Sequence, residues 1–113
     1  MYVKESIVKQ SAARLDKIGY KLYIYDAIEF ESERYCPIEI SRKNGFKGIE
    51  PEISEDMMSR YDKPAFYLST SSNGSELNLE EFAEYLERMK QLVVVLDELE
   101  RNAISDGDAR GIR

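Results

Sequence analysis

The segment that begins at Asn78 constrains the fold most, because its apolar residues surround a helix instead of occupying one side. Asn78, with Glu81 three residues later, has the pattern of a capping box, which predicts a helix to Asn102 or Ile104. One apolar stripe follows spacings of three and four and comprises Leu79, Phe82, Leu86, Met89, Val93 and Leu96. A second stripe beside it comprises Tyr85, Leu92, Val95 and Leu99. A helix that is apolar all round must be covered all round.

The first stripe is expected to lie on a sheet, and the second leaves two alternatives open. In one, the N-terminal helix of the same chain covers the second stripe. In the other, Tyr85, Leu92, Val95 and Leu99 form a self-association surface through which the chain makes a homodimer.

A shorter amphipathic helix is predicted near the N-terminus. Apolar residues recur at spacings of three and four from Val3 to Ile18, and charged residues occupy the other side. Gly19 follows directly, as expected of a residue that ends a helix.

A long strand is predicted from Tyr20 to Glu31, where apolar residues alternate with polar ones and tyrosines. The even-numbered residues form the apolar side, and only Asp26 interrupts it. A bulge near Asp26 and Ala27 would resolve this conflict. The odd-numbered side then carries Tyr23 and Tyr25.

Three further strands are predicted. The first runs from Tyr35 to Lys43 and ends at the tight-turn pair Asn44-Gly45. A short returning strand over residues 46–53 is weakened by Pro51, and the next strand covers Ala65 to Thr70.

The 113 residues suit one α+β domain. It consists of an N-terminal helix, an antiparallel sheet of three to four strands and a long C-terminal helix packed on the sheet. Residues 1–104 are expected to form this domain. Residues 105–113 are a polar tail that frays unless something holds it.

Charge and cysteine usage restrict the partners and the compartment. The net charge of −6 disfavours direct binding to nucleic acid, which carries the same sign. A single cysteine, Cys36, and no signal-peptide pattern point to the cytoplasm. The longest apolar run, Leu92 to Leu96, is too short to span a bilayer, so no membrane association is predicted.

The residue types that carry most catalysis are missing. The chain has no histidine, and Cys36 has no obvious activating neighbour in sequence. One cysteine without histidine makes a zinc site improbable, and the acids lack the pattern of a calcium-binding loop. No catalytic residue, cofactor or metal site is therefore predicted, and the chain is interpreted as not an enzyme.

A surface of tyrosines and carboxylates is the predicted site for a partner. Tyrosine is favoured at interfaces, and carboxylates suit a basic protein. The candidate partner-binding residues are Tyr23, Tyr25, Glu29, Glu31, Glu39, Glu50, Glu52, Glu55 and Asp56.

The order helix, strands, helix resembles double-stranded RNA-binding domains. Their basic cluster at the start of the last helix is replaced here by Asn78-Leu-Glu-Glu81, so RNA binding is not implied. The same order, the small size and the acidity are similar to some phage-encoded inhibitors of bacterial defence, including anti-CRISPR proteins. This resemblance covers about residues 6–104, rests on no residue motif and transfers no functional residue.

Two functions are therefore expected as alternatives. The first is a non-enzymatic protein-binding module, such as a phage-type inhibitor or adaptor, which docks a basic, nucleic-acid-handling protein. The second is a structural or assembly protein that forms homo-oligomers through its C-terminal helix.

Overall fold

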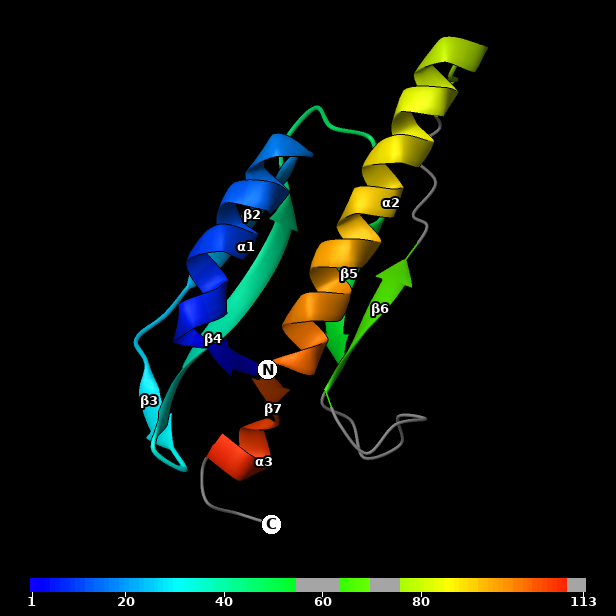
Figure 1. Ribbon diagram of the computed structural model, residues 1–113. Helices are drawn as coiled ribbons and strands as arrows, with labels where there is room; N and C mark the ends of the chain where they lie inside the picture. The colour runs from blue at the N-terminus through cyan, green and yellow to red at the C-terminus, as the bar shows by residue number, and fades with distance from the viewer. Residues whose placement is uncertain (55–63, 70–75, 110–113) are drawn as a thin grey trace.

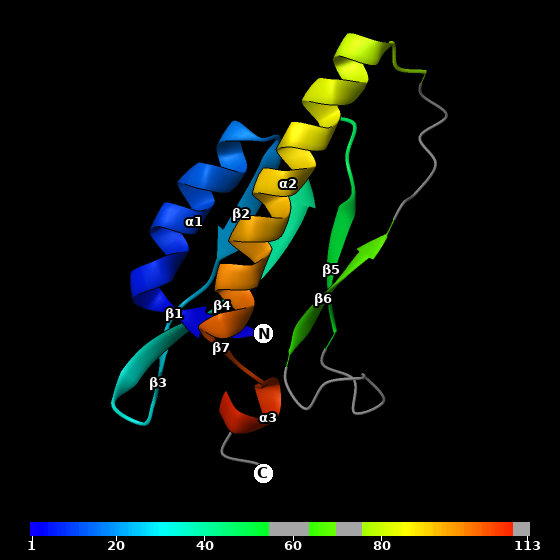
Figure 2. The same cartoon turned by 45° about the vertical axis from the view of Figure 1, so that its right-hand side comes forward.

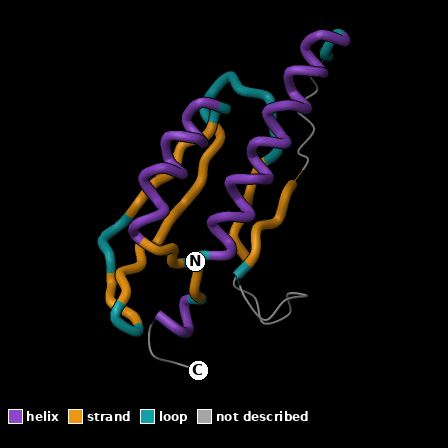
Figure 3. The backbone as a smooth tube through the Cα atoms, in the orientation of Figure 1, coloured by secondary structure: helices purple, strands orange, loops and turns teal. Residues whose placement is uncertain are grey.

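The computed structural model describes residues 1–54, 64–69 and 76–109. Two long helices lie side by side and cover the same side of the strands (Figure 1; Figure 2). The predicted α+β class is confirmed, with an N-terminal helix, antiparallel strands and a long C-terminal helix (Figure 3). The strands, however, form two separate sheets instead of one.

The first helix, α1 (Glu5–Lys17), matches the prediction except at its start. Glu5 in its first turn and Lys17 in its last turn suit the helix dipole. Gly19 has a φ of +93°, and a side chain there would also clash with the ring of Phe46. Helix formation was predicted from Val3, but Tyr2–Lys4 form strand β1. The prediction is wrong there because β1 pairs with strands on both sides, and such pairing overrides local helical spacing.

The long helix, α2 (Leu79–Arg101), begins with the predicted capping box. The side-chain oxygen of Asn78 accepts a hydrogen bond from the backbone N–H of Glu81 at 2.8 Å. A carboxylate oxygen of Glu81 accepts one from the backbone N–H of Asn78 at 3.3 Å. The helix ends at Arg101, close to the predicted end at Asn102.

The main sheet contains β2 (Tyr20–Ile24), β3 (Ile28–Phe30) and β4 (Glu33–Arg42), together with β1 and the short β7 (Ala103–Ile104). The strand order is β2-β4-β1-β7, and β3 also pairs with β4. Ile24 is paired with Ile38, and Ile28 is paired with Tyr35. Between these two pairs the chain moves four residues along β2 and β3 but three residues along β4, so the β2–β3 side contains one extra residue. The bulge predicted near Asp26 is therefore present, and it reverses the sides of the residues after it.

The second sheet is a hairpin of β5 (Glu50–Ser54) and β6 (Ala65–Ser69). β5 was predicted as a strand returning along the first sheet, but it pairs with β6 instead. Pro51 is tolerated in β5 because its backbone nitrogen points away from β6. The missing N–H therefore removes no inter-strand hydrogen bond. The backbone N–H of Phe66 donates to a carboxylate oxygen of Glu100 at 2.7 Å, which ties the hairpin to α2.

The C-terminal segment is held by the fold as far as residue 109. β7 pairs with β1, and a single short helix, α3 (Asp106–Ala109), contacts β3 (Figure 1). Asp106 also accepts a hydrogen bond from the amino group of Met1 at 3.2 Å. In the neighbouring part of the sheet, Tyr35 of β4 is buried and packs edge-on against Phe30 of β3. The rest of the predicted tail, 110–113, lies outside the described residues.

Candidate functional site

The second apolar stripe of α2 is buried, whereas most of the first is exposed. Leu92, Val95 and Leu99 are almost completely buried, and Tyr85 is half-buried. α1 packs beside α2 over this stripe, so the alternative in which the same chain covers it holds. Leu92, Val95 and Leu99 therefore cannot serve as the self-association surface, because their side chains already fill the core.

The first stripe is the exposed one. The expectation that it lies on the sheet is correct for Met89 and Leu96, which are buried, and wrong for its other members. The side of α2 formed by Leu79, Phe82, Leu86 and Val93 is called the exposed stripe below. Leu79 is 90% exposed, and the other three are between 47 and 50% exposed.

Most of the exposed stripe belongs to the first ten residues of α2, Leu79–Arg88, called the projecting half below. All five buried residues of α2 lie after it, from Met89 onward. α1 has 13 residues and α2 has 23, which correspond to about 20 and 35 Å of helix. The shorter helix cannot cover the longer one, and the N-terminal end of α2 extends beyond α1 (Figure 1; Figure 2).

The projecting half is also strongly acidic. It contains four glutamates, at positions 80, 81, 84 and 87, and one arginine, Arg88. The ring of Phe82 stacks on that of Tyr85 with centroids 6.3 Å apart. The guanidinium of Arg88 lies over the ring of Phe46 at 5.7 Å from its centroid, so the one cation of this segment already has an aromatic contact.

A small groove continues the exposed stripe toward the second sheet. An open cavity of about 160 Å³ lies between α2 and β6, lined by Phe66, Leu68, Val93, Leu96, Asp97 and Glu100. Leu68 and Val93 are both about half-exposed. The described parts of α2 and β6 thus share one apolar surface with carboxylates at its margin.

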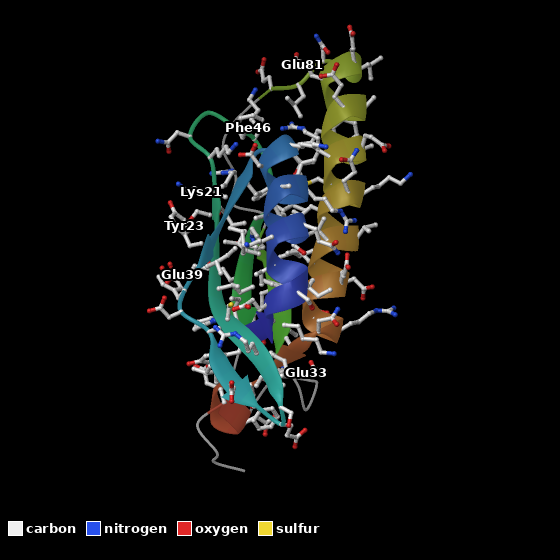
Figure 4. All side chains as sticks on the ribbon, turned by 60° about the vertical axis from the view of Figure 1, so that its left-hand side comes forward. Lys21, Tyr23, Glu33, Glu39, Phe46 and Glu81 are labelled. Atoms are coloured by element: carbon white, nitrogen blue, oxygen red, sulfur yellow. The ribbon has the colours of Figure 1, made fainter. Side chains whose placement is uncertain are left out.

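The predicted tyrosine surface is present but small. Tyr23 and Glu39 are directly opposite each other on β2 and β4, and both point away from the helices, as does Lys21 (Figure 4). The hydroxyl of Tyr25 donates to a carboxylate oxygen of Glu39 at 2.9 Å, which raises the pKa of Tyr25. The ammonium of Lys21 lies 5.0 Å from the ring centroid of Tyr23. The charges of Lys21 and Glu39 balance, so this face is not acidic.

The other predicted partner-binding acids do not join this face. Glu29 lies on the opposite side of the sheet, because the bulge reverses the sides after Ala27. Glu31 is in the two-residue turn between β3 and β4, where its φ is +50°. Glu50 pairs with Arg42 at 2.8 Å, and Glu52 belongs to the second sheet. Glu55 and Asp56 lie outside the described residues.

The titratable groups of the described core show no activated nucleophile. Burial, with the carboxylate of Glu5 nearby, raises the pKa of the Cys36 thiol, which keeps it protonated at neutral pH. Nowhere in the described ranges do three or more metal-ligating side chains gather. The helices described here also include none that is long and apolar enough to cross a membrane.

The acids of the projecting half are visible in the sequence, where Glu81 predicts the capping box, but none of the four was assigned to the partner surface. Their exposure depends on the length of α1 relative to that of α2. A local sequence pattern cannot predict this, because the two helices are far apart in the chain. Comparisons with protein-family models, with curated proteins and with solved structures gave no match.

Proposed function

We propose that the chain is a non-enzymatic protein-binding module that docks its partner through the projecting half of α2 and the adjoining groove. The observation that carries this proposal is a half-helix with no buried residue and with Leu79, Phe82 and Leu86 exposed along one side. Amphipathic helices of this kind commonly bind by placing their apolar side in a groove of the partner. An exposed apolar stripe of this extent costs solubility, which favours a function for it.

The charge of the projecting half favours a basic partner. Four glutamates lie within ten residues, and the single arginine already contacts Phe46. Such a cluster accelerates encounter with a positively charged protein and is screened by salt. An inhibitor or adaptor of a nucleic-acid-handling protein would be a module of this type. The acidic and aromatic character expected of the docking surface is thus retained, while its location moves from the sheet to α2.

Site-specific photo-crosslinking tests the proposal in the cells that produce the chain. A benzophenone amino acid replaces Phe82 in one version and Ala13, which is exposed on α1, in the control. We expect a crosslinked product with a basic protein at position 82 and none at position 13. Adding Leu86→Ser should abolish this product, and adding Glu80→Lys with Glu84→Lys should reduce it most at low salt.

Three results would contradict the proposal. They are no product at position 82, equal products at both positions, or a product that ignores Leu86→Ser. A product with the mass of two chains would instead favour the alternative function, self-assembly through α2. Leu79, Leu86 and Val93 are seven residues apart, which suits pairing of two such helices.

A further inference from the structure

The outer edge of β2 has no neighbouring strand among the described residues. β2 is the end strand of the main sheet, and β4 is its single partner in the described ladder. An open edge presents unpaired backbone N–H and C=O groups and is a template for another strand. This edge belongs to the main sheet, whereas the exposed stripe of α2 adjoins β6 of the second sheet, so the inference goes beyond the proposed function.

The ladder between β2 and β4 shows which groups face the open edge. The backbone N–H of Tyr25 donates to Pro37 at 3.0 Å, and that of Lys43 donates to Gly19 at 2.9 Å. Hydrogen-bonded pairs alternate along an antiparallel ladder, so the intervening odd-numbered residues of β2 also bond to β4. The backbone groups of Tyr20, Leu22 and Ile24 therefore point outward from the sheet.

The protection of this edge is slight. Proteins usually guard open edges with charges, prolines or bulges. β2 has one charged residue, Lys21, and no proline, and the bulge comes only after Tyr25. Ile24 points to the helix side of the sheet but is 40% exposed, whereas Tyr20 and Leu22 on the same side are buried.

We propose that a second copy of this chain pairs with β2 in antiparallel orientation, with the two-fold axis at Leu22. Leu22 then faces its own counterpart, and Tyr20 of each copy faces Ile24 of the other. These three pairs use all the outward backbone groups of both strands. The two main sheets become one, with α1 and α2 of both copies on the same side.

Charge complementarity favours a second copy over an unrelated strand. The two-fold axis places Lys21 of one copy opposite Tyr23 of the other, on the face away from the helices. Glu39 lies beside Tyr23 on the next strand, so each Lys21 approaches the Glu39 of the other copy. Within one chain the described contacts of Lys21 and Glu39 are to tyrosines, at 5.0 Å to the Tyr23 ring and 2.9 Å from the Tyr25 hydroxyl.

Amide hydrogen exchange of the unaltered chain, combined with sedimentation, tests the proposal. At low concentration the Leu22 and Ile24 amides should exchange rapidly, while those of Lys21 and Tyr23, bonded to β4, stay protected. At high concentration a dimer should sediment, and the Leu22 and Ile24 amides should become protected. A monomer at all concentrations, or a dimer that leaves these two amides unprotected, would overturn the proposal.

Two variants and two controls sharpen this test. Ile24→Pro removes an outward N–H without touching the β4 ladder, and by symmetry it deletes two hydrogen bonds, so dimerisation should weaken about tenfold or more. Lys21→Glu should weaken it roughly tenfold, because two like-charge contacts replace two attractive ones.

Lys9→Glu makes the same charge change at an exposed position of α1 and should leave the dimer intact. Leu86→Ser should also leave it intact, and a dimer lost with Leu86→Ser but kept with Ile24→Pro would contradict pairing through β2.

Discussion

The two halves of α2 differ in their surroundings far more than in their residues. The projecting half contains Leu79, Phe82, Tyr85 and Leu86, enough apolar residues for a buried helix, yet none of its residues is buried. The second half, from Met89 onward, contributes five buried residues to the core. Both halves belong to one uninterrupted helix with a complete capping box at its start.

This difference shows that an amphipathic pattern gives a helix its apolar sides but does not decide which side is covered. Which side is buried depends on the length and position of the neighbouring helix or strand. α1 ends after about 20 Å, so most side chains in the remaining turns of α2 stay exposed in the part of the chain that the structure describes. An apolar surface left in this way is available to a partner.

The largest expected contrast is in the free energy of unfolding when a leucine of each half is truncated. Leu92→Ala removes a fully buried side chain and should cost about 3 kcal/mol. Leu86→Ala removes a half-exposed side chain and should cost less than about 0.7 kcal/mol. Urea denaturation measures both. Equal losses would mean that the two halves are equally covered, and the comparison would fail.

A smaller loss of folding free energy is expected from a substitution at Tyr20, which belongs to the same core cluster as the first buried residue of α2. Tyr20 is buried in the core cluster that also contains Met89, and its hydroxyl donates to the carbonyl of Ile49 at 2.6 Å. Tyr20→Phe should cost about 1.5 kcal/mol, because the carbonyl loses its partner. Tyr67→Phe, at an exposed ring, is the matched control and should change little.

The same residue should make stability depend on alkaline pH. Burial raises the pKa of Tyr20 from 10.0 to about 12, so the folded chain holds this proton more tightly than the unfolded chain. The contribution of this proton to the free energy of unfolding is fully present below pH 10 and is lost as the pH rises toward about 12. Urea denaturation across this range should show a steeper decline for the unaltered chain than for Tyr20→Phe. Parallel declines would contradict the burial of this hydroxyl.

The smallest effect concerns α1, which covers the second half of α2. The hydroxyl of Ser11 is fully buried and has no hydrogen-bond partner among the described residues. Ser11→Ala should stabilise the fold by about 1 kcal/mol, because an unsatisfied polar group leaves the core. Ser6→Ala, at an exposed position of the same helix, corrects for helix propensity. A loss of stability with Ser11→Ala would show that this hydroxyl makes a bond in solution.

Local chemistry made the start of α2, the bulge and most strands predictable from the sequence. Asn78 with Glu81 specifies a capping box within four residues, and Asp26 breaks an alternation that is visible along the chain. β1 and β7 were missed because each is short and exists through pairing with residues far away in sequence. The exposed stripe of α2 was not foreseen for a similar reason, since the lengths of two distant helices decide which apolar stripe stays exposed.

One consequence of the bulge could not be predicted from the local sequence. Its position was predicted, but its effect on the sides of later residues was not. The bulge places Glu29 on the helix side, so the acids expected on one face are divided between two. A one-residue change of register reverses every later side chain, and therefore a surface predicted across a bulge is unreliable.

Hydrogen exchange along α2 tests the central claim most directly, namely that this helix has a covered half and a projecting half available to a partner. In the dilute chain, amides from Met89 onward should exchange through global unfolding, while those before Arg88 should exchange through local opening with much less protection. When the partner crosslinked at position 82 is added, the projecting half should gain protection and the covered half should change little. Uniform protection along α2 in the dilute chain, or no gain in the projecting half with the partner present, would contradict the account.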